Sequence, residues 1–173
     1  MNKGVVYLVP CPIGDNSPGS VLPKHTLEII QSLEYFIVEN EKTSRQFLRS
    51  ANHPKAIREL NFETLNKHTN QTDIINYIDP ISEGKSIGII SEAGCPGVAD
   101  PGAQIISLAH KNNIQVIPLI GPSSILMALM GSGFSGQSFS FVGYLPKDKN
   151  ALKSRIKELE GLSKKYNQTQ LFI

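Results

Sequence analysis

The sequence predicts an α/β fold: a mainly parallel five-stranded sheet with helices on both faces, followed by the start of a second α/β domain. Short, β-branched apolar runs recur along the chain, as in strands that are buried on both faces. Segments with helical periodicity separate these runs, and such alternation is typical of βαβ units. Hydrophobic residues make up 40% of the 173 residues, which is enough for a sizeable core.

About five strands are expected in the main sheet. The strongest run is residues 86–91, and the weakest pattern is residues 57–62. The expected strands are residues 4–9, 35–38, 57–62, 86–91, 115–119 and 139–142. Residues 10–20, which hold three prolines and two glycines, are expected to form a loop.

Six helices are expected between and after these strands. Residues 72–83 place Ile74, Ile75 and Ile78 inward, and Pro80 should kink or end this helix near Asp79. Residues 123–130 are so apolar that we expect them to pack deep in the protein. The expected helices are residues 24–33, 44–50, 72–83, 103–111, 123–130 and 151–159.

Two domains are expected, residues 1–120 and residues 121–173. The second would consist of a connecting helix and the beginning of an incomplete domain. The charge pattern changes after Pro146: residues 147–165 carry seven basic and three acidic side chains, a local charge of +4. Residues 170–173 read as a strand that has just begun, so we expect the sequence to be part of a longer protein.

The composition excludes some functions and leaves others open. The formal net charge of +2 neither demands nor forbids a nucleic-acid partner. No run of eighteen apolar residues predicts a membrane span, and Met1-Asn2-Lys3 does not open a signal peptide. The histidines lack the spacing of metal ligands, so no metal site is expected; they are His25, His53, His68 and His110.

Three loops are expected at the edge of the sheet where the parallel strands end, which is where open α/β sheets bind ligands. All three are rich in glycine, proline and small residues, and they follow the strands at 4–9, 86–91 and 115–119. They comprise residues 10–15, 91–102 and 120–124. Each loop alone reads as an ordinary turn. Three such loops at the same edge of the sheet favour a ligand site.

The loops also indicate what kind of ligand would fit. Glycine permits close approach of the backbone, and proline lowers the cost of ordering the loop on binding. Neither a Walker loop nor a Gly-x-Gly-x-x-Gly fingerprint is present, and none of the three loops contains lysine or arginine. Glu92 and Asp100 add negative character, so a cationic or neutral ligand with an adenine-like ring fits better than a polyphosphate.

Two cysteines occur in these loops. Cys11 and Cys95 are expected to be reduced, small packing residues, although a nucleophilic role is conceivable. No Gly-x-Ser-x-Gly elbow of a serine hydrolase is present.

Four sequence blocks are specific as an ordered set, although each alone is weak. They are Pro10-Cys11-Pro12-Ile13-Gly14, Ser91-Glu92-Ala93-Gly94-Cys95-Pro96 with Asp100-Pro101-Gly102, Gly121-Pro122-Ser123, and Phe141-Val142-Gly143-Tyr144-Leu145-Pro146. With these blocks the chain resembles the ribosomal small-subunit RNA (cytidine-2′-O)-methyltransferases of the tetrapyrrole methylase superfamily. The resemblance covers nearly the whole chain.

The resemblance implies a two-domain cytoplasmic enzyme, usually a homodimer, that binds S-adenosylmethionine between its domains and methylates RNA of the small ribosomal subunit. Residues 1–120 would then be the cofactor-binding domain. The expected cofactor-binding residues are Pro12, Ile13, Gly14, Ser91, Glu92, Ala93, Gly94, Cys95, Pro96, Asp100, Gly121, Pro122, Ser123 and Ser124.

The chain departs from the family pattern at several positions. The pattern Ala-Glu-Asp-Thr-Arg is here Val38-Glu39-Asn40-Glu41-Lys42, and Ser-Asp-Ala-Gly-Thr-Pro is here Ser-Glu-Ala-Gly-Cys-Pro, with Glu92 and Cys95 changed. Pro80 interrupts a helix that is normally unbroken in the family. These changes indicate a divergent branch of the family.

Glu39 and Lys42 are the catalytic candidates. Glu39 could act as a general base or position the substrate, and Lys42 could contact phosphate. The competing interpretations are a helix cap at Thr43 or Ser44 for Glu39, and a solvated surface lysine for Lys42. Asp100 could likewise start the next helix instead of contacting a ligand.

Three functions therefore remain open from the sequence. The first is an RNA ribose methyltransferase, supported by the order of the blocks and the basic stretch after Pro146. The second is a methylase of a tetrapyrrole-like small molecule, favoured by the near-neutral charge. The third is a cofactor-binding module without catalysis, for which Asn40 and Glu92 are the motivation.

Overall fold

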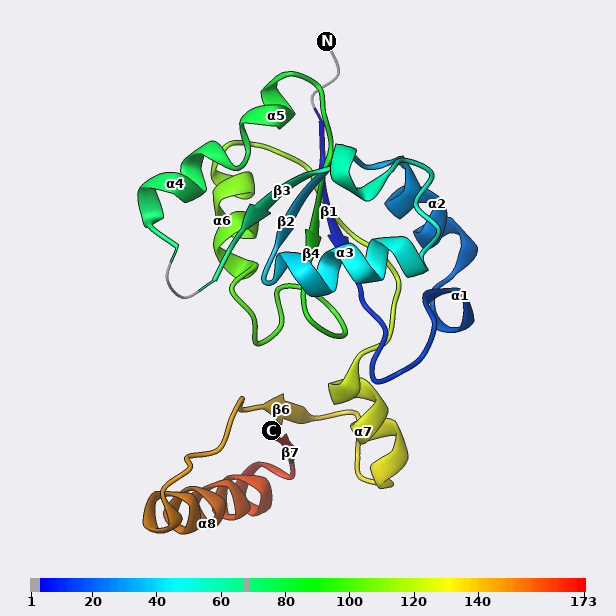
Figure 1. Ribbon diagram of the computed structural model, residues 1–173. Coiled ribbons are helices and arrows are strands. Elements are labelled where there is room, and N and C mark those ends of the chain that lie inside the picture. Colours follow the sequence, from blue (N-terminus) through cyan, green and yellow to red (C-terminus); the bar gives the residue numbers. More distant parts are fainter. Residues whose placement is uncertain (1–3, 67–68) are drawn as a thin grey trace. The chain divides into compact units, whose positions relative to one another are not determined.

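A computed structural model describes residues 4–66 and 69–173 (Figure 1). Its main sheet is five-stranded and all parallel, in the order β3-β2-β4-β1-β5. The strands are β1 (Val6–Val9), β2 (Tyr35–Val38), β3 (Asn61–Thr64), β4 (Ile87–Ile90) and β5 (Val116–Pro118). The predicted fold class is confirmed. The expectations for Met1-Asn2-Lys3 and His68 lie outside the described residues.

Helices cover both faces of this sheet, as predicted. On one face α2 (Lys24–Ser32) and α3 (Glu41–Ser50) pack Ile30 and Leu48 against β1, β2 and β4. On the other face α5 (Asp79–Ser82) and α6 (Ala103–Lys111) pack Ile81 and Ile105. The two layers are visible in Figure 1, where β4 and β1 run between them.

The central strand β4 is buried along its whole length, because it pairs with β1 and β2 and is covered on both faces. Gly88 has a specific steric role in this strand. A Cβ atom at this position would lie 3.0 Å from both Leu33 Cδ1 and Phe36 Cδ1. The absence of a side chain therefore leaves room for Leu33, which follows α2, and for Phe36 of the neighbouring strand β2.

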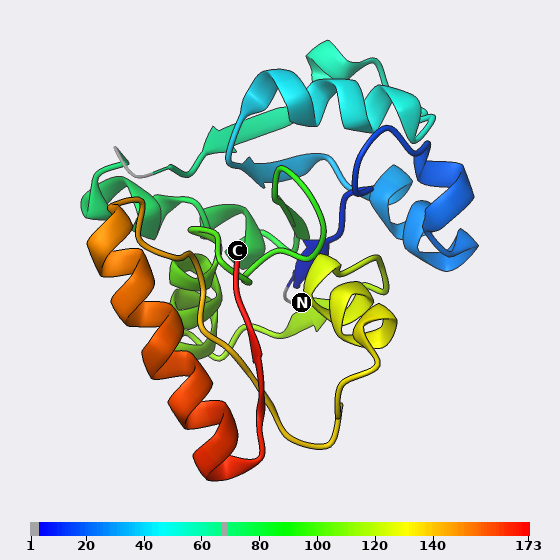
Figure 2. The same ribbon diagram turned by 90° about the horizontal axis from the view of Figure 1, so that it is seen from below.

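The chain divides into two compact units, Met1–Pro122 and Ser123–Ile173. The second unit contains α7 (Ser124–Ser132), β6 (Phe139–Phe141), α8 (Lys149–Tyr166) and β7 (Thr169–Leu171). Strands β6 and β7 pair in parallel, so β6, α8 and β7 form a β-α-β unit. Figure 2 shows α8 running alongside β7, and the side chain of Leu159 is buried.

The strand expected at residues 57–62 is only partly correct. Residues 57–59 form the 3-10 helix η1 (Ile57–Glu59), and β3 begins after it. The N–H of Asn61 donates to the carbonyl of Glu34, and Asn61 pairs with Tyr35, the first residue of β2. Residues 57–59 therefore precede the point at which the neighbouring strand begins, so no strand is available to pair with them.

The helical region around Pro80 breaks where the sequence predicts. The helix α4 (Gln71–Asn76) ends before Tyr77, and α5 begins at Asp79 with Pro80 in its first turn, where a missing N–H costs nothing. Ile74 is buried as expected, but the inward placement of Ile75 is wrong, because its side chain is 58% exposed. Ile75 directly follows Ile74 in α4, so its side chain points about 100° away from the buried side of the helix.

Two further expectations are corrected. Residues 18–20 are not loop, because the short helix α1 (Pro18–Val21) begins there with Pro18 in its first turn. The apolar helix α7 does not pack deep: Leu129 is buried, whereas Met127 is 58% and Met130 83% exposed.

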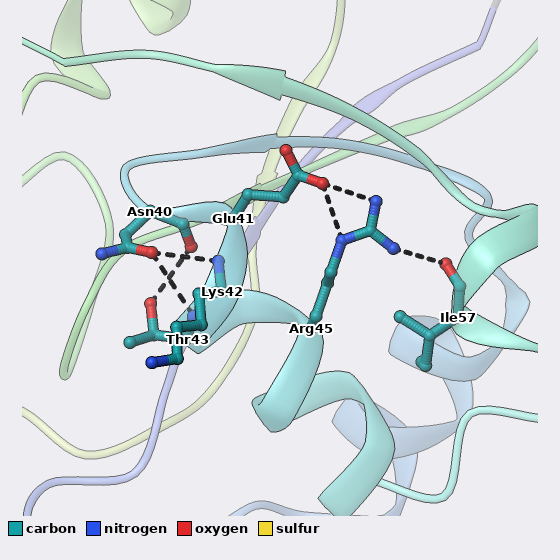
Figure 3. Close-up of polar contacts among 6 residues, drawn as sticks. All are labelled: Asn40, Glu41, Lys42, Thr43, Arg45 and Ile57. Carbon is teal, nitrogen blue, oxygen red and sulfur yellow. Dashed lines mark hydrogen bonds and ion pairs between the residues drawn. The ribbon is translucent and has the colours of Figure 1, made fainter.

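The helix α3 begins three residues earlier than predicted because Asn40 caps it. Asn40 Oδ1 accepts hydrogen bonds from the N–H groups of Lys42 (3.0 Å) and Thr43 (3.5 Å), as Figure 3 shows. Glu41 then pairs with Arg45 one turn later, and Arg45 Nη1 donates to the Ile57 carbonyl at 3.0 Å. The cap thus begins a helix whose first turn is anchored to η1.

Removal of this cap should destabilise the chain. Asn40→Ala leaves two N–H groups of α3 without their acceptor and is expected to lower the free energy of unfolding by about 1 kcal/mol. Asn40→Asp keeps the acceptor and should stay near the wild-type value. Urea denaturation followed by circular dichroism measures both. Equal stability of Asn40→Ala and Asn40→Asp would contradict the capping role.

Candidate functional site

The loops after β1 and β4 are joined by their backbones at the carboxyl edge of the sheet. Cys11 and Gly94 exchange two hydrogen bonds as an isolated antiparallel bridge: the N–H of Cys11 lies 2.9 Å from the Gly94 oxygen, and the reverse bond is 3.1 Å. Gly94 has a φ of +68°, a conformation that glycine adopts without steric cost. Two loops that are 83 positions apart in sequence therefore meet here.

The loop after β5 closes on the same point. Cys95 Sγ donates to the Pro122 carbonyl at 3.3 Å, and a Cβ atom on Gly121 would lie 2.3 Å from two ring carbons of Pro10. The buried hydroxyl of Thr26 donates to the Ile120 carbonyl at 3.0 Å. The convergence of the three loops, which the sequence predicts, is present in the structure.

Both cysteines serve packing. Cys11 is 4% exposed within the core, where burial, followed by the charge of Glu92, raises the pKa of its thiol to about 12. Burial also raises the pKa of Cys95, whose thiol is a hydrogen-bond donor to Pro122. Thiols with raised pKa values stay protonated at neutral pH, so neither cysteine has the character of a nucleophile.

Asp100 holds the long loop after β4 in shape. Its carboxylate accepts hydrogen bonds from the N–H of Gly97 at 2.9 Å and from the N–H of Gly102 at 2.8 Å. Burial raises the pKa of this carboxyl although both bonds oppose the shift. Asp100 thus orders the turn that precedes α6, but it does not start that helix, because the N-cap of α6 is Gly102.

Glu39 lies at the end of β2 and is not the cap of α3, because Asn40 fills that position. The interpretation of Glu39 as a cap is therefore wrong. Burial is the main reason that the pKa of Glu39 is raised, and the charges of Glu92 and Asp100 raise it further. Glu39 borders a recess that is also lined by Ser91 and Asp100.

Glu92 links the loop after β4 to the first turn of α3. Its Oε1 accepts a hydrogen bond of 2.6 Å from Thr43 Oγ1. Thr43 and Glu92 also line a cavity of about 160 Å³, together with Pro12, Gly14, Phe47 and Ser91 among others. Pro12, Gly14, Ser91 and Glu92, all predicted site residues, therefore border one hollow at the edge of the sheet.

Lys42 lies in the first turn of α3 with an exposed side chain. It forms no ion pair with any residue in the described ranges, so its charge is available to solvent or to a ligand. Sequence reasoning missed the roles of Asn40 and Thr43. A capping Asn before an acidic first turn is a recognisable signal for Asn40, whereas no local signal marks the contact from Thr43 to Glu92.

The other predicted residues occupy two places. Ile13, Ala93 and Pro96 lie in the joined loops, where Ser91 Oγ donates to the Ala93 carbonyl at 3.4 Å. Ser123 caps α7 through a 3.4 Å bond from the N–H of Leu126, and Ser124 is the first residue of that helix. These two serines belong to the second unit.

The site is acidic and lacks metal-ligand geometry. Glu39, Glu92 and Asp100 interact electrostatically, and no lysine or arginine occurs in residues 10–15, 91–102 or 120–124. Within residues 4–66 and 69–173, no three His, Cys, Asp or Glu side chains are grouped so that they could hold a metal ion. None of the described helices has the length and apolar character of a membrane span.

The fold and these loops define an α/β chain with a candidate ligand site at the carboxyl edge of a parallel sheet. The chain is similar to proteins named "Ribosomal RNA small subunit methyltransferase I". It is 30% identical over 160 residues to that of Vibrio cholerae, 32% over 157 residues to that of Halalkalibacterium halodurans, and 31% over 171 residues to that of Bacillus subtilis.

These matches cover 91–99% of the chain and 52–54% of the relatives. The chain therefore spans about half the length of these curated relatives. The resemblance inferred from the four sequence blocks is confirmed. No protein-family model matches the chain.

A side chain at Gly121 should separate two of the three loops. Gly121→Ala places Cβ on the rigid ring of Pro10, so we expect a loss of about 1–3 kcal/mol in the free energy of unfolding. Gly19→Ala is the matched control, because a Cβ at Gly19 has no heavy atom within 4 Å. Chemical denaturation measures both variants. A Gly121→Ala variant as stable as Gly19→Ala would contradict the close approach.

The raised pKa of Glu39 predicts a pH-dependent effect on stability. The folded chain disfavours the ionised form of Glu39, so ionisation of this carboxyl lowers the free energy of unfolding. This loss of stability is absent below the ordinary glutamate pKa of 4.5 and is complete above the pKa that Glu39 has in the folded chain. Glu39→Gln should therefore raise Tm more at pH 7 than at pH 4. Exposed Glu59→Gln controls for the loss of one negative charge. A Glu39→Gln advantage that grew as the pH fell would refute the assignment.

Proposed function

We propose that this chain carries the cofactor-binding domain, residues 1–120, of an S-adenosylmethionine-dependent methyltransferase that modifies ribose 2′-oxygens in RNA of the small ribosomal subunit. The observation that carries this proposal is the junction of three loops through Cys11, Gly94 and Pro122. The sequence blocks of the methyltransferase resemblance lie in these loops. The names of the similar proteins support the RNA substrate.

The chemistry of the site fits a sulfonium cofactor. Three carboxyl groups give the edge a negative character. Burial raises the pKa of Glu39 most, and a cation would relieve the repulsion from Glu92 and Asp100 that raises it further. Glycines in the loops let backbone groups approach a ring closely. Gly14, Gly94 and Gly121 would hold the cofactor together with Ser91, Glu92 and Pro122. When bound, the cofactor supplies an activated methyl group and needs no metal.

Glu39 would serve as the general base in this proposal. Its raised pKa brings the carboxylate closer to the working pH, which makes proton transfer from a hydroxyl more favourable than for an ordinary glutamate. Glu39 would accept the proton of a ribose 2′-hydroxyl on a carboxylate oxygen. Lys42, whose side chain is exposed, would contact a neighbouring phosphate.

The cytoplasm is the compartment that this substrate requires, and a homodimer is the assembly that the family resemblance implies. The two competing functions, methylation of a tetrapyrrole-like compound and cofactor binding without catalysis, predict other results in the experiments below.

Cofactor binding should depend on the conformation of Gly94. Gly94→Ala strains a residue with φ +68° at the loop junction, and we expect an affinity for S-adenosylmethionine about tenfold lower by calorimetry. Gly133→Ala creates similar strain at φ +73° at the end of α7 and should keep wild-type affinity. Equal losses in both variants would assign the effect to general strain and would contradict the site.

Methyl transfer should depend on Glu39. With radiolabelled S-adenosylmethionine and small ribosomal subunits, Glu39→Gln should lower kcat by about 10²–10⁴-fold while Glu59→Gln retains activity. Label on a porphyrinoid precursor, but not on RNA, would favour the tetrapyrrole alternative. Cofactor binding without transfer to any acceptor would favour the non-catalytic module.

A further inference from the structure

We propose that one face of α8, defined by Lys149, Lys153 and Lys157 and called here the lysine face, binds the phosphate backbone of RNA. The inference rests on the proposed function, because it names the surface that would hold the RNA substrate. It assigns a partner to a helix that the loop site does not use.

The lysine face is a regular row of charges on a well-defined helix. Asp148 caps α8 by accepting hydrogen bonds from the N–H groups of Asn150 (3.1 Å) and Ala151 (2.9 Å). Lys149, Lys153 and Lys157 are four residues apart, so they lie on one side of the helix. At a rise of about 1.5 Å per residue, the row extends roughly 12 Å.

The opposite side of α8 packs on its own unit. Leu159 is 2% exposed, and Leu152 and Leu162 are half-buried. Packing against β7 fixes the rotation of the helix, so the three lysines are exposed. The helix therefore presents these charges to solvent in a constant arrangement.

The charges of the lysine face are not neutralised within the chain. The acidic residues of α8 pair elsewhere: Glu158 with Arg155 at 2.7 Å and Glu160 with Lys164 at 2.5 Å. Lys149, Lys153 and Lys157 form no ion pair with any residue that the structure describes. Residues 147–165 keep a charge of +4, so a polyanion would gain favourable interactions without displacing an existing partner.

The residues around the row favour nucleic acid over a lipid surface. A helix that lies on a membrane needs bulky apolar residues beside its basic ones. Asn150, Ser154 and Gly161 flank one side of the lysine face, and Ile156, which is 46% exposed, lies on its other side. The leucines of α8 are buried or half-buried, so this isoleucine is the bulky apolar residue beside the row, and one such residue gives little apolar surface for a membrane. Lysine ammonium groups contact phosphates as point charges without reading bases. The lysine face would therefore bind RNA independently of its base sequence.

The test is the salt dependence of RNA binding by the 173-residue chain. Fluorescence anisotropy of a labelled single-stranded oligoribonucleotide between about 50 and 200 mM salt gives the slope of log K against log salt. Lys149→Gln, Lys153→Gln and Lys157→Gln, combined in one variant, should reduce the slope by about 2, because each lost phosphate contact contributes about 0.7. Glutamine preserves helix propensity, and circular dichroism verifies that α8 still forms.

A matched variant separates position from total charge. Lys24→Gln, Lys55→Gln and Lys111→Gln remove the same three charges from the first unit and should leave the slope within about 0.7 of wild type. Equal slopes in the two triple variants would overturn the assignment of RNA binding to the lysine face. S-adenosylmethionine binding, measured in parallel, would show that the proposed function is unaffected by this result.

Two other outcomes would also overturn the inference. A wild-type chain that binds S-adenosylmethionine but no RNA would remove the RNA substrate of the proposed function, and the lysine face with it. Binding to phosphatidylserine vesicles that is lost in the α8 variant, with RNA binding unchanged, would assign the face to a lipid surface.

Discussion

The hydrogen-bonded pair of Cys11 and Gly94 is the interaction on which the candidate site depends. Parallel strands β1 and β4 end beside each other, and this bridge holds together the two loops that follow them. It satisfies backbone groups that burial of Cys11 would otherwise leave without partners. Once it is made, Cys95 reaches the Pro122 carbonyl and the third loop is joined. The shape of the edge thus follows from main-chain pairing, supplemented by the side chains of Thr26, Cys95 and Asp100.

The two units carry opposite chemistry. At the edge of the main sheet, Glu39, Glu92 and Asp100 interact without a basic residue in the three loops, a setting that suits a cation. In the second unit, α8 exposes lysines that no described carboxylate pairs. A methyltransferase that acts on RNA needs both features, since its methyl donor is a cation and its substrate is a polyanion. The distribution of charge along the chain is therefore consistent with one function divided between two units.

Much of the fold could be predicted, because strands buried on both faces and amphipathic helices leave strong periodic patterns. Residues 35–38 and 103–111 match the observed β2 and α6. The failures have physical causes. Residues 57–59 lack a neighbouring strand, and Ile75 points away from the core because it directly follows the buried Ile74 in α4, about 100° further round the helix. For the site, the convergence of loops was predictable from strand order, whereas the contact of Thr43 with Glu92 was not.

The sequence by itself determined the class of fold, the edge at which the loops gather and the family that the chain resembles. These properties are encoded in periodicity and in short blocks, which are local. The tertiary structure decided which carboxyls interact and which thiol is buried. These properties depend on distances between segments such as α3 and the loop after β4, which are 49 positions apart at Thr43 and Glu92. A carboxyl acquires its pKa and its role from such neighbours, and only the folded chain brings them together.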